Sequence, residues 1–252
     1  MFPDLIDLGF LHLKTYGACM ATGFLLCWWL VERQSGRKDL SNLLLALMVA
    51  GVVGSRIAYV IEHWSLEFAA HPERIVRIDQ GGLMFYGGLI LALVVFFAWC
   101  RRTKEHPLAL ANLLATVVPL GHAFGRLGCF FYGCCYGRDS DAWCAVTFPI
   151  GSPSWYEHER QLVAVLPTQL FEAAALLALF AFLYVLYRRG RRYTAGAYLV
   201  GYAVIRFGME FLRGDPRAAV GPLSISQTIS IGLAALGAVL LALDAKMKHG
   251  KE

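Results

Sequence analysis

The chain has 252 residues, of which 58% are hydrophobic and 16% are charged, and its formal net charge is +5 at pH 7. A soluble domain carries about 25% charged residues, so this composition excludes an ordinary soluble protein. The mean hydropathy of +0.54 instead favours a chain that lies mostly in a membrane.

Apolar segments follow one another along the chain, and each approaches the roughly 20 residues that a membrane-spanning helix needs. Residues 1–15 precede them and lack the cleavage site of a signal peptide, so we expect an arm in the membrane interface. The sequence predicts an all-α membrane protein with seven transmembrane helices, folded as one multispanning domain over residues 1–252. The expected spans are 16–33, 40–61, 81–100, 108–124, 167–187, 195–212 and 224–243.

Basic residues are distributed unevenly between the loops. They gather in the short segments 33–38, 101–104, 188–192 and 246–251, whereas those on the other side are fewer and more widely spread. Short basic loops are typical of the cytoplasmic side of a membrane. We therefore expect the N-terminus outside, the C-terminus inside, and an exported head at about residues 125–166. Topology and contact with anionic membrane lipids explain these charges better than nucleic-acid binding does.

Four arginines lie in or beside the apolar segments: Arg56, Arg126, Arg206 and Arg213. An arginine at this depth is costly unless an anion partners it, and the segments contain few carboxylates. The guanidinium group binds phosphate through two parallel N–H groups. The pattern predicts that the arginines share a phospholipid head group. The alternative is that Arg206 and Glu210, four residues apart on one helical face, merely neutralise each other.

Four of the seven cysteines fall on the predicted exported side: Cys129, Cys134, Cys135 and Cys144. That side is oxidising, and no histidine lies among these cysteines at zinc-finger spacing. We therefore predict two disulfides rather than a metal site. The bonds should not join the neighbours Cys134 and Cys135, because the Cα atoms of a disulfide usually lie about 5.5 Å apart. The connectivity stays open.

Six motifs in the same order resemble those of the prolipoprotein diacylglyceryl transferase family. The signature GRLGCFFYG is the most specific of them, and Gln227 falls in a further family segment near the last helix. The motifs are Tyr16-Gly17, GSRIAYV (54–60), GGLMFYGGLI (81–90), GRLGCFFYG (125–133), LPTQLFEA (166–173) and YAVIRFGMEFLRGDP (202–216).

This resemblance implies a helical body with a small exported head in the bacterial cytoplasmic (inner) membrane. It implies a transferase that moves the diacylglyceryl group of phosphatidylglycerol to the lipobox cysteine thiol of an exported prolipoprotein. The product would be a thioether, and glycerol phosphate would leave. The implied partners are phosphatidylglycerol, membrane lipids, and the prolipoprotein signal peptide with its lipobox. No cofactor and no metal are implied.

The resemblance also assigns roles. Arg126 matches the signature arginine and Arg206 the second essential arginine, so both are predicted to be catalytic. His122 and Tyr86 are candidates to take the thiol proton: His122 lies four residues before Arg126, and Tyr86 stands where the family often has a histidine. His122 could equally be a buried histidine bonded to a backbone carbonyl. The predicted substrate-binding residues are Tyr16, Arg56, Gly87, Gly88, Gln169, Glu172, Tyr202, Glu210 and Arg213.

Several positions depart from the family pattern. Cys129 and Tyr132 replace two asparagines of the signature, Cys134 replaces a glutamate, and Leu166 replaces a histidine. These changes keep two alternatives open: a paralogous phospholipid-dependent transferase with a different acceptor, and a non-transferase membrane protein that exchanges disulfides or binds lipid. A thiol-redox enzyme usually has Cys-x-x-Cys, which this sequence lacks. A transporter is expected to have inverted repeats, and we identify none.

Overall fold

The computed structural model describes residues 4–7, 12–77, 81–190, 193–216 and 219–249. It divides into two compact units, the first comprising residues 1–31 and 111–252 and the second residues 32–110. The single domain expected over residues 1–252 stays a prediction. Four basic residues of the charge pattern lie outside the described residues: Arg191, Arg192, Arg217 and Lys251.

The first unit begins with the segment expected to be an interfacial arm. Strand β1 (Asp4–Asp7) pairs antiparallel with β2 (His12–Lys14), and helix α1 (Thr15–Ser35) follows directly. The start of the chain is therefore a short hairpin leading into the first expected span.

The fourth expected span is broken into α4 (Pro107–Leu114) and α5 (Val118–Tyr132), which are bent by 45° at the break. Pro119 lies in the first turn of α5, where its missing N–H prevents a continuous helix across the junction. Helix α5 ends at Tyr132, and Gly133 caps it with a φ of 81°. Residues 125–132, which we expected in the head, are therefore helical. The helix continues to Tyr132 because Gly133 adopts the left-handed conformation that ends it.

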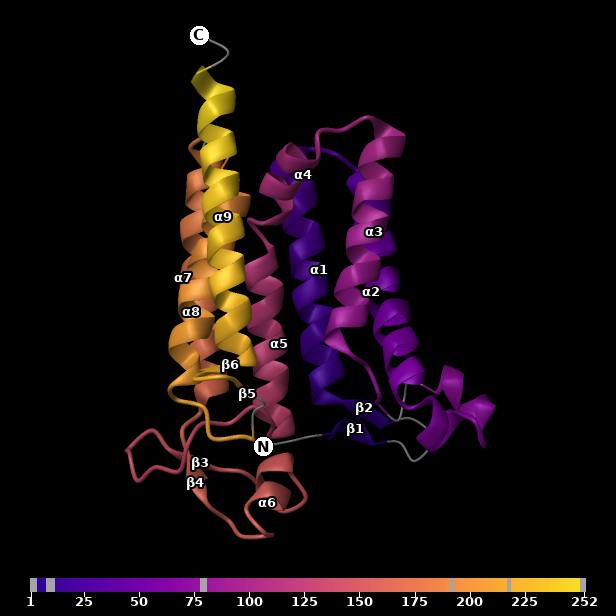
Figure 1. The fold of residues 1–252 in the computed structure, drawn as a ribbon, viewed down its shortest axis with the longest axis vertical. Coiled ribbons are helices and arrows are strands. Elements are labelled where there is room, and N and C mark those ends of the chain that lie inside the picture. The colour runs from indigo at the N-terminus through magenta and orange to yellow at the C-terminus, as the bar shows by residue number, and fades with distance from the viewer. Residues whose placement is uncertain (1–3, 8–11, 78–80, 191–192, 217–218, 250–252) are drawn as a thin grey trace. The chain divides into compact units, whose positions relative to one another are not determined.

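The head, residues 133–167, is a small irregular segment between α5 and α7 (Figure 1). Strand β3 (Val146–Thr147) pairs with β4 (Ala164–Val165), and α6 (Pro153–Glu157) lies between them in the sequence. The head has its own core of Tyr136, Phe148 and Val165, with Phe130 of α5 against it. Burial raises the pKa of Tyr136 to about 12.

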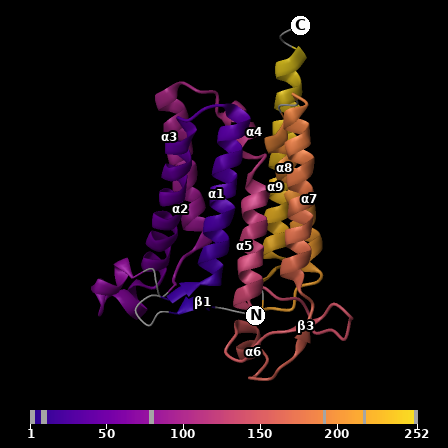
Figure 2. The same ribbon diagram turned by 180° about the vertical axis from the view of Figure 1, so that it is seen from behind.

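Long helices complete the first unit: α7 (Thr168–Arg188), α8 (Thr194–Glu210) and α9 (Ile225–His249), with β5 (Ala219–Val220) pairing with β6 (Leu223–Ser224) before α9. Helix α5 packs on α7, α7 on α8, and α8 on α9. The head lies at one end of this group in both views (Figure 1, Figure 2). Because α7 has 21 residues, it is about 30 Å long, the thickness of a bilayer core.

The second unit is a helical hairpin. Helices α2 (Leu40–Glu62) and α3 (Phe85–Thr103) pack together, joined by a connection with a π-helical turn, η1 (Trp64–Phe68), and a 3₁₀ turn, η2 (Pro72–Val76). The two backbones approach closely: a Cβ added at Gly87 would lie 2.4 Å from the carbonyl oxygen of Gly54. Small residues permit such contacts between membrane helices.

The described residues form a mostly helical protein with four helices long and apolar enough to span a membrane, or five if α4 and α5 form one span. The four are α2, α3, α7 and α9. Helices α1 and α8 occupy their expected positions without meeting this test, and α8 has only 17 residues. The expected membrane protein is confirmed, whereas the count of seven spans and their orientation stay predictions.

Candidate functional site

A buried ion pair joins α5 to α7. The Arg126 Nη2 atom lies 3.0 Å from Glu172 Oε1, and the Glu172 side chain is fully buried. The same oxygen lies 4.0 Å from His122 Nε2, because His122 precedes Arg126 by one helical turn. The His122 ring is 5.0 Å from the Tyr202 ring of α8, measured between centroids. Three helices therefore bring together four residues that the sequence singled out.

A second ion pair lies on α8. Arg206 Nη2 is 2.8 Å from Glu210 Oε2, as expected for residues one turn apart. The same nitrogen donates a hydrogen bond of 2.6 Å to Ser226 Oγ in the first turn of α9. Sequence reasoning missed Ser226, although it directly precedes the family-like Gln227. We call His122, Arg126, Glu172, Tyr202, Arg206 and Glu210 the arginine cluster.

Arg213 lies just beyond α8 and pairs with Asp215, with Nε 2.8 Å from Oδ1 and Nη2 2.8 Å from Oδ2. Burial raises the pKa of Asp215, and the charge of Arg213 opposes this effect. Arg126, Arg206 and Arg213 therefore each have one carboxylate partner. The expectation that these arginines have few carboxylate partners is therefore wrong, because folding brings Glu172 and Asp215 to them.

Donor groups nevertheless remain on these arginines. Arg126 Nε, Arg206 Nη1 and Arg213 Nη1 are buried and have no hydrogen-bond partner among the described residues, and the carboxylate oxygens of Glu172 and Glu210 likewise form ion pairs without a hydrogen bond there. A buried donor left unpaired is costly, and proteins usually satisfy such groups. The geometry therefore offers N–H groups to an anionic ligand.

Arg56, in the second unit, is bonded quite differently. Its guanidinium group donates to five backbone carbonyl oxygens, at distances from 2.6 to 3.2 Å. Its Cζ atom also lies 5.5 Å from the Tyr59 ring centroid and 5.3 Å from that of Phe68. The acceptors belong to Arg74, Ile75, Arg77, Gly81 and Gly82. Arg56 thus organises the connection between α2 and α3.

The other predicted residues of the second unit lie in the first turn of α3. Tyr86 is exposed and packs edge-on against Phe85. A Cβ on Gly87 would clash with Ala58 Cβ at 2.3 Å, and one on Gly88 with Ser55 Oγ at 2.3 Å. Packing against α2 therefore accounts for glycine at both positions, and substrate contact by all three residues stays a prediction.

Two further predicted residues adjoin the head. Tyr16 packs against α5, since a Cβ on Gly128 would meet its ring at 2.8 Å. Gln169 is fully buried, and its Nε2 donates to the carbonyl oxygen of Cys134 at 2.7 Å. Its neighbour Thr168, missed by the sequence analysis, donates to the carbonyl oxygen of Cys135 at 2.9 Å. The LPTQ segment thus anchors the start of the head.

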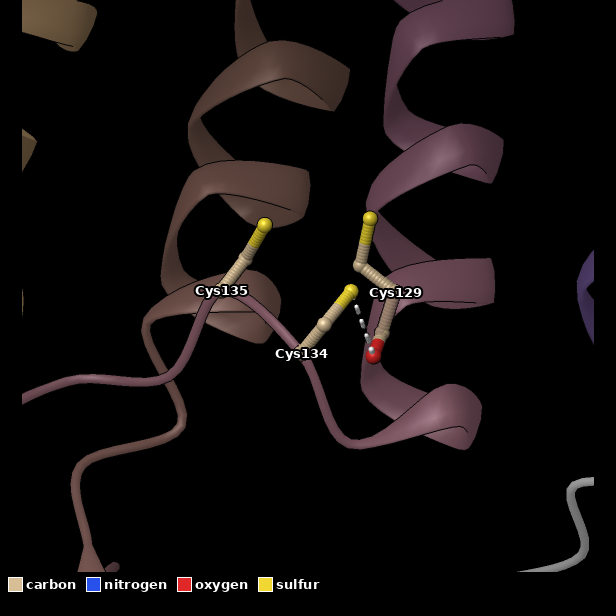
Figure 3. Close-up of side chains that lie close together, drawn as sticks. All are labelled: Cys129, Cys134 and Cys135. Atoms are coloured by element: carbon tan, nitrogen blue, oxygen red, sulfur yellow. Dashed lines mark hydrogen bonds between the residues drawn. The ribbon is translucent and has the colours of Figure 1, made fainter. Parts of the chain in front are cut away.

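Three thiols gather where α5 meets the head. The sulfur atoms of Cys129, Cys134 and Cys135 all lie within 4.8 Å of one another and project in the same direction (Figure 3). We call these residues the cysteine triad. All seven cysteines are free thiols, so the two expected disulfides are not formed here, and Cys144 does not belong to the triad. A triad of thiols could hold a metal ion, which spacing alone did not indicate.

Hydrogen bonds with Cys129 and Cys134 lower the pKa of Cys135 strongly, and the charges of Arg213 and Arg126 act in the same direction. The triad therefore lies within electrostatic range of two arginines of the candidate site.

Comparison with known proteins gives one family. The model of the prolipoprotein diacylglyceryl transferase family matches residues 3–243. A phosphatidylglycerol–prolipoprotein diacylglyceryl transferase of Pseudoalteromonas translucida is 32% identical, over 95% of this chain and 91% of its own. A relative in Clostridium perfringens, with the same name and the suffix 2, is 32% identical over 96% and 94%. A Photobacterium profundum relative is 31% identical over 95% and 91%.

Proposed function

The chain belongs to the prolipoprotein diacylglyceryl transferase family, and on that premise we propose that it transfers the diacylglyceryl group of phosphatidylglycerol to the lipobox cysteine thiol of exported prolipoproteins. Its relatives carry this activity in their names. The observation that supports the proposal most directly is the set of buried, unpaired N–H groups on Arg126 and Arg206.

The arginine cluster fits the donor. Phosphatidylglycerol carries one phosphodiester, and a carbon–oxygen bond to that phosphate breaks during transfer. Negative charge grows on the leaving phosphate, so donors already aimed at it stabilise the transition state. We propose that Arg126 and Arg206 hold this phosphate and that Glu172 and Glu210 orient the two guanidinium groups. We propose that Tyr202, whose ring faces His122, also contacts the substrates, as do Arg213, Tyr16 and Gln169.

The acceptor thiol must lose a proton before it attacks. We propose His122 for this step because its Nε2 atom lies 4.0 Å from Glu172 Oε1, a carboxylate that would stabilise the protonated ring. Its ring faces Tyr202. Tyr86, the alternative acceptor, is an exposed phenol on α3, and an ordinary phenol with a pKa near 10 is a weak base.

We further propose seven spans in the bacterial cytoplasmic membrane, with the N-terminus and the head on the exported side. The short basic segments support this orientation. The signal peptide of the prolipoprotein would then lie in the bilayer with its lipobox near the head. Impermeant labelling of single cysteines introduced at positions 155 and 190, in a chain whose seven native cysteines are replaced by serine, tests it, since only position 155 should react in intact cells.

The activity is tested by mass spectrometry of a lipobox peptide incubated with the purified protein and phosphatidylglycerol. The expected product gains one diacylglyceryl group on the cysteine, and a peptide with serine in its place gains none. Arg138→Ala is a suitable control because Arg138 is an exposed arginine of the head. A modified lipid without a modified peptide would indicate a different acceptor.

A further inference from the structure

The course of the chain brings the cysteine triad together. Gly133 ends α5 with a left-handed φ, and the chain then turns back so that the Cys134 N–H donates to the Cys129 carbonyl oxygen at 3.2 Å. Cys135 itself has a φ of +64°. A residue other than glycine rarely adopts this conformation and keeps it only where its surroundings hold it. Here it allows neighbouring side chains to project to one side (Figure 3).

Buried contacts hold this conformation in place. The carbonyl oxygens of Cys134 and Cys135 accept hydrogen bonds from Gln169 and Thr168, and both donor residues are completely buried at the start of α7. The backbone of all three triad residues is therefore held in place. Cys129 belongs to the last turn of α5, and side chains of α7 bind the carbonyl groups of Cys134 and Cys135. The thiols themselves are only partly buried, which leaves them accessible to a ligand.

The donor set favours a particular metal. Three thiolates are soft ligands that suit zinc and similar ions, and zinc–sulfur bonds are about 2.3 Å long in tetrahedral geometry, which places sulfurs about 3.8 Å apart. The triad sulfurs, within 4.8 Å of one another, need shifts of only about 1 Å to reach this spacing. Zinc sites with three protein ligands keep the fourth position for a reacting group.

We propose that Cys129, Cys134 and Cys135 bind one zinc ion, and that its fourth position binds the acceptor cysteine thiol; the second part rests on the proposed function. Coordination deprotonates a thiol. The proton passes through water to His122, which lies two turns of α5, or about 10 Å, from Cys129, and the zinc-bound sulfur attacks the carbon of the diacylglyceryl group that bears the phosphate. A carbon–sulfur bond forms as the carbon–oxygen bond breaks, and glycerol phosphate leaves with the bonding electron pair. No oxidant or reductant is needed.

The position of the triad supports this role. Cys129 follows Arg126 by three residues, so the two lie on successive turns of α5. The zinc-bound thiol would then lie next to the phosphate that Arg126 binds. The charges of Arg126 and Arg213, which both act on Cys135, would also offset the excess negative charge of three thiolates around a divalent ion.

Metal binding is tested with the full chain in detergent, purified under reducing conditions, stripped with a chelator and then titrated with zinc alone. One zinc ion per chain is expected. Cys129→Ser, Cys134→Ser and Cys135→Ser should each weaken binding by at least about 100-fold, whereas Cys144→Ser is the matched control and should bind normally. Equal affinity in the triad variants, or a native disulfide within the triad by intact-mass analysis, overturns the proposal.

The fourth ligand is tested with cobalt(II) in place of zinc, because its visible spectrum reports tetrahedral thiolate coordination. A lipobox peptide should shift the spectrum, and the serine peptide should leave it unchanged. A spectrum that does not change when the cysteine peptide is added overturns the assignment of the fourth position.

Transfer assays separate this inference from the proposed function. Full transfer by the metal-free protein or by Cys135→Ser means that the transferase is correct and the zinc site is wrong. If the zinc-loaded protein binds the peptide thiol but transfers no lipid, the proposed function fails, and the activating role of the zinc fails with it.

Discussion

Two regions use buried arginines in opposite ways. In the second unit, Arg56 donates all its hydrogen bonds to backbone carbonyls around one connection. In the first unit, Arg126 and Arg206 each pair with one carboxylate and keep a buried donor without a partner among the described residues. The hydrogen bonds of Arg56 are thus made within the protein, whereas Arg126 and Arg206 each keep an N–H group that a ligand could bind.

This difference shows that the number of arginines in apolar helices does not define a phosphate site. The hydrogen-bond acceptors around each guanidinium group decide its role. We therefore infer that Arg56 has a structural role and that Arg126 and Arg206 have a ligand-binding one. The same substitution by lysine should therefore have different effects in the two regions.

The largest effect is expected from Arg126→Lys and Arg206→Lys. A lysine keeps the charge but not the planar pair of donors, and the lost contacts act on charge that grows in the transition state. Transfer should fall by at least about 100-fold in each variant, measured as the initial rate of peptide lipidation, while melting temperatures change little. Near-normal rates in both variants would remove the cluster from the mechanism.

For Arg56→Lys, the expected loss is in stability. Three donors cannot satisfy five carbonyls, and unsatisfied buried groups cost roughly 1–3 kcal/mol each. We expect a destabilisation of about 2–4 kcal/mol, seen as a lower melting temperature in detergent. The folded fraction should keep its affinity for phosphatidylglycerol. A variant of normal stability with weakened lipid binding would contradict the distinction drawn here.

His122→Gln tests the proton transfer. A glutamine keeps a hydrogen-bonding side chain but cannot take the proton, so turnover should fall by about 10²-fold. Binding of phosphatidylglycerol should be retained, and the dependence of rate on pH should change. Tyr86→Phe is the companion variant with a milder expected effect. If Tyr86→Phe is inactive and His122→Gln is not, the two roles are reversed.

The smallest effect is expected from Glu172→Gln. The amide removes the charge that orients Arg126 while keeping the shape of the side chain. Turnover should fall by about 10-fold, and the KM for phosphatidylglycerol should rise less. A variant that fails to fold would instead show that the pair with Arg126 is mainly structural.

Much of this arrangement could be predicted from the sequence because it depends on helical periodicity. His122 and Arg126 share a face of α5, and Arg206 and Glu210 share a face of α8. The motif LPTQLFEA marked Glu172 as a substrate-binding residue, but its pairing with Arg126 was not predicted. The apolar segments likewise predicted where the helices lie, although their bounds moved by a few residues.

Other features depend on the course of irregular segments, which leaves no periodic signal. The groups that accept hydrogen bonds from Arg56 are backbone carbonyls of the connection between α2 and α3. Every residue has such a carbonyl, so no side chain in the sequence indicates which ones Arg56 binds. The cysteine triad exists because Gly133 and Cys135 adopt left-handed conformations. The bond from Arg206 to Ser226 depends instead on how α8 packs on α9, and the break before α5 follows from Pro119, which the sequence analysis did not use.

The central claim is that Arg126 binds the lipid phosphate with the help of its unpaired Nε donor and that Arg56, whose donors are bonded to backbone carbonyls, does not. The most direct test compares the affinity of the purified protein for phosphatidylglycerol with its affinity for diacylglycerol, which has the same tails and no phosphate. We predict that Arg126→Lys loses most of the preference for phosphatidylglycerol and that the folded fraction of Arg56→Lys keeps it. An unchanged preference in Arg126→Lys, or its loss in Arg56→Lys alone, would contradict the account.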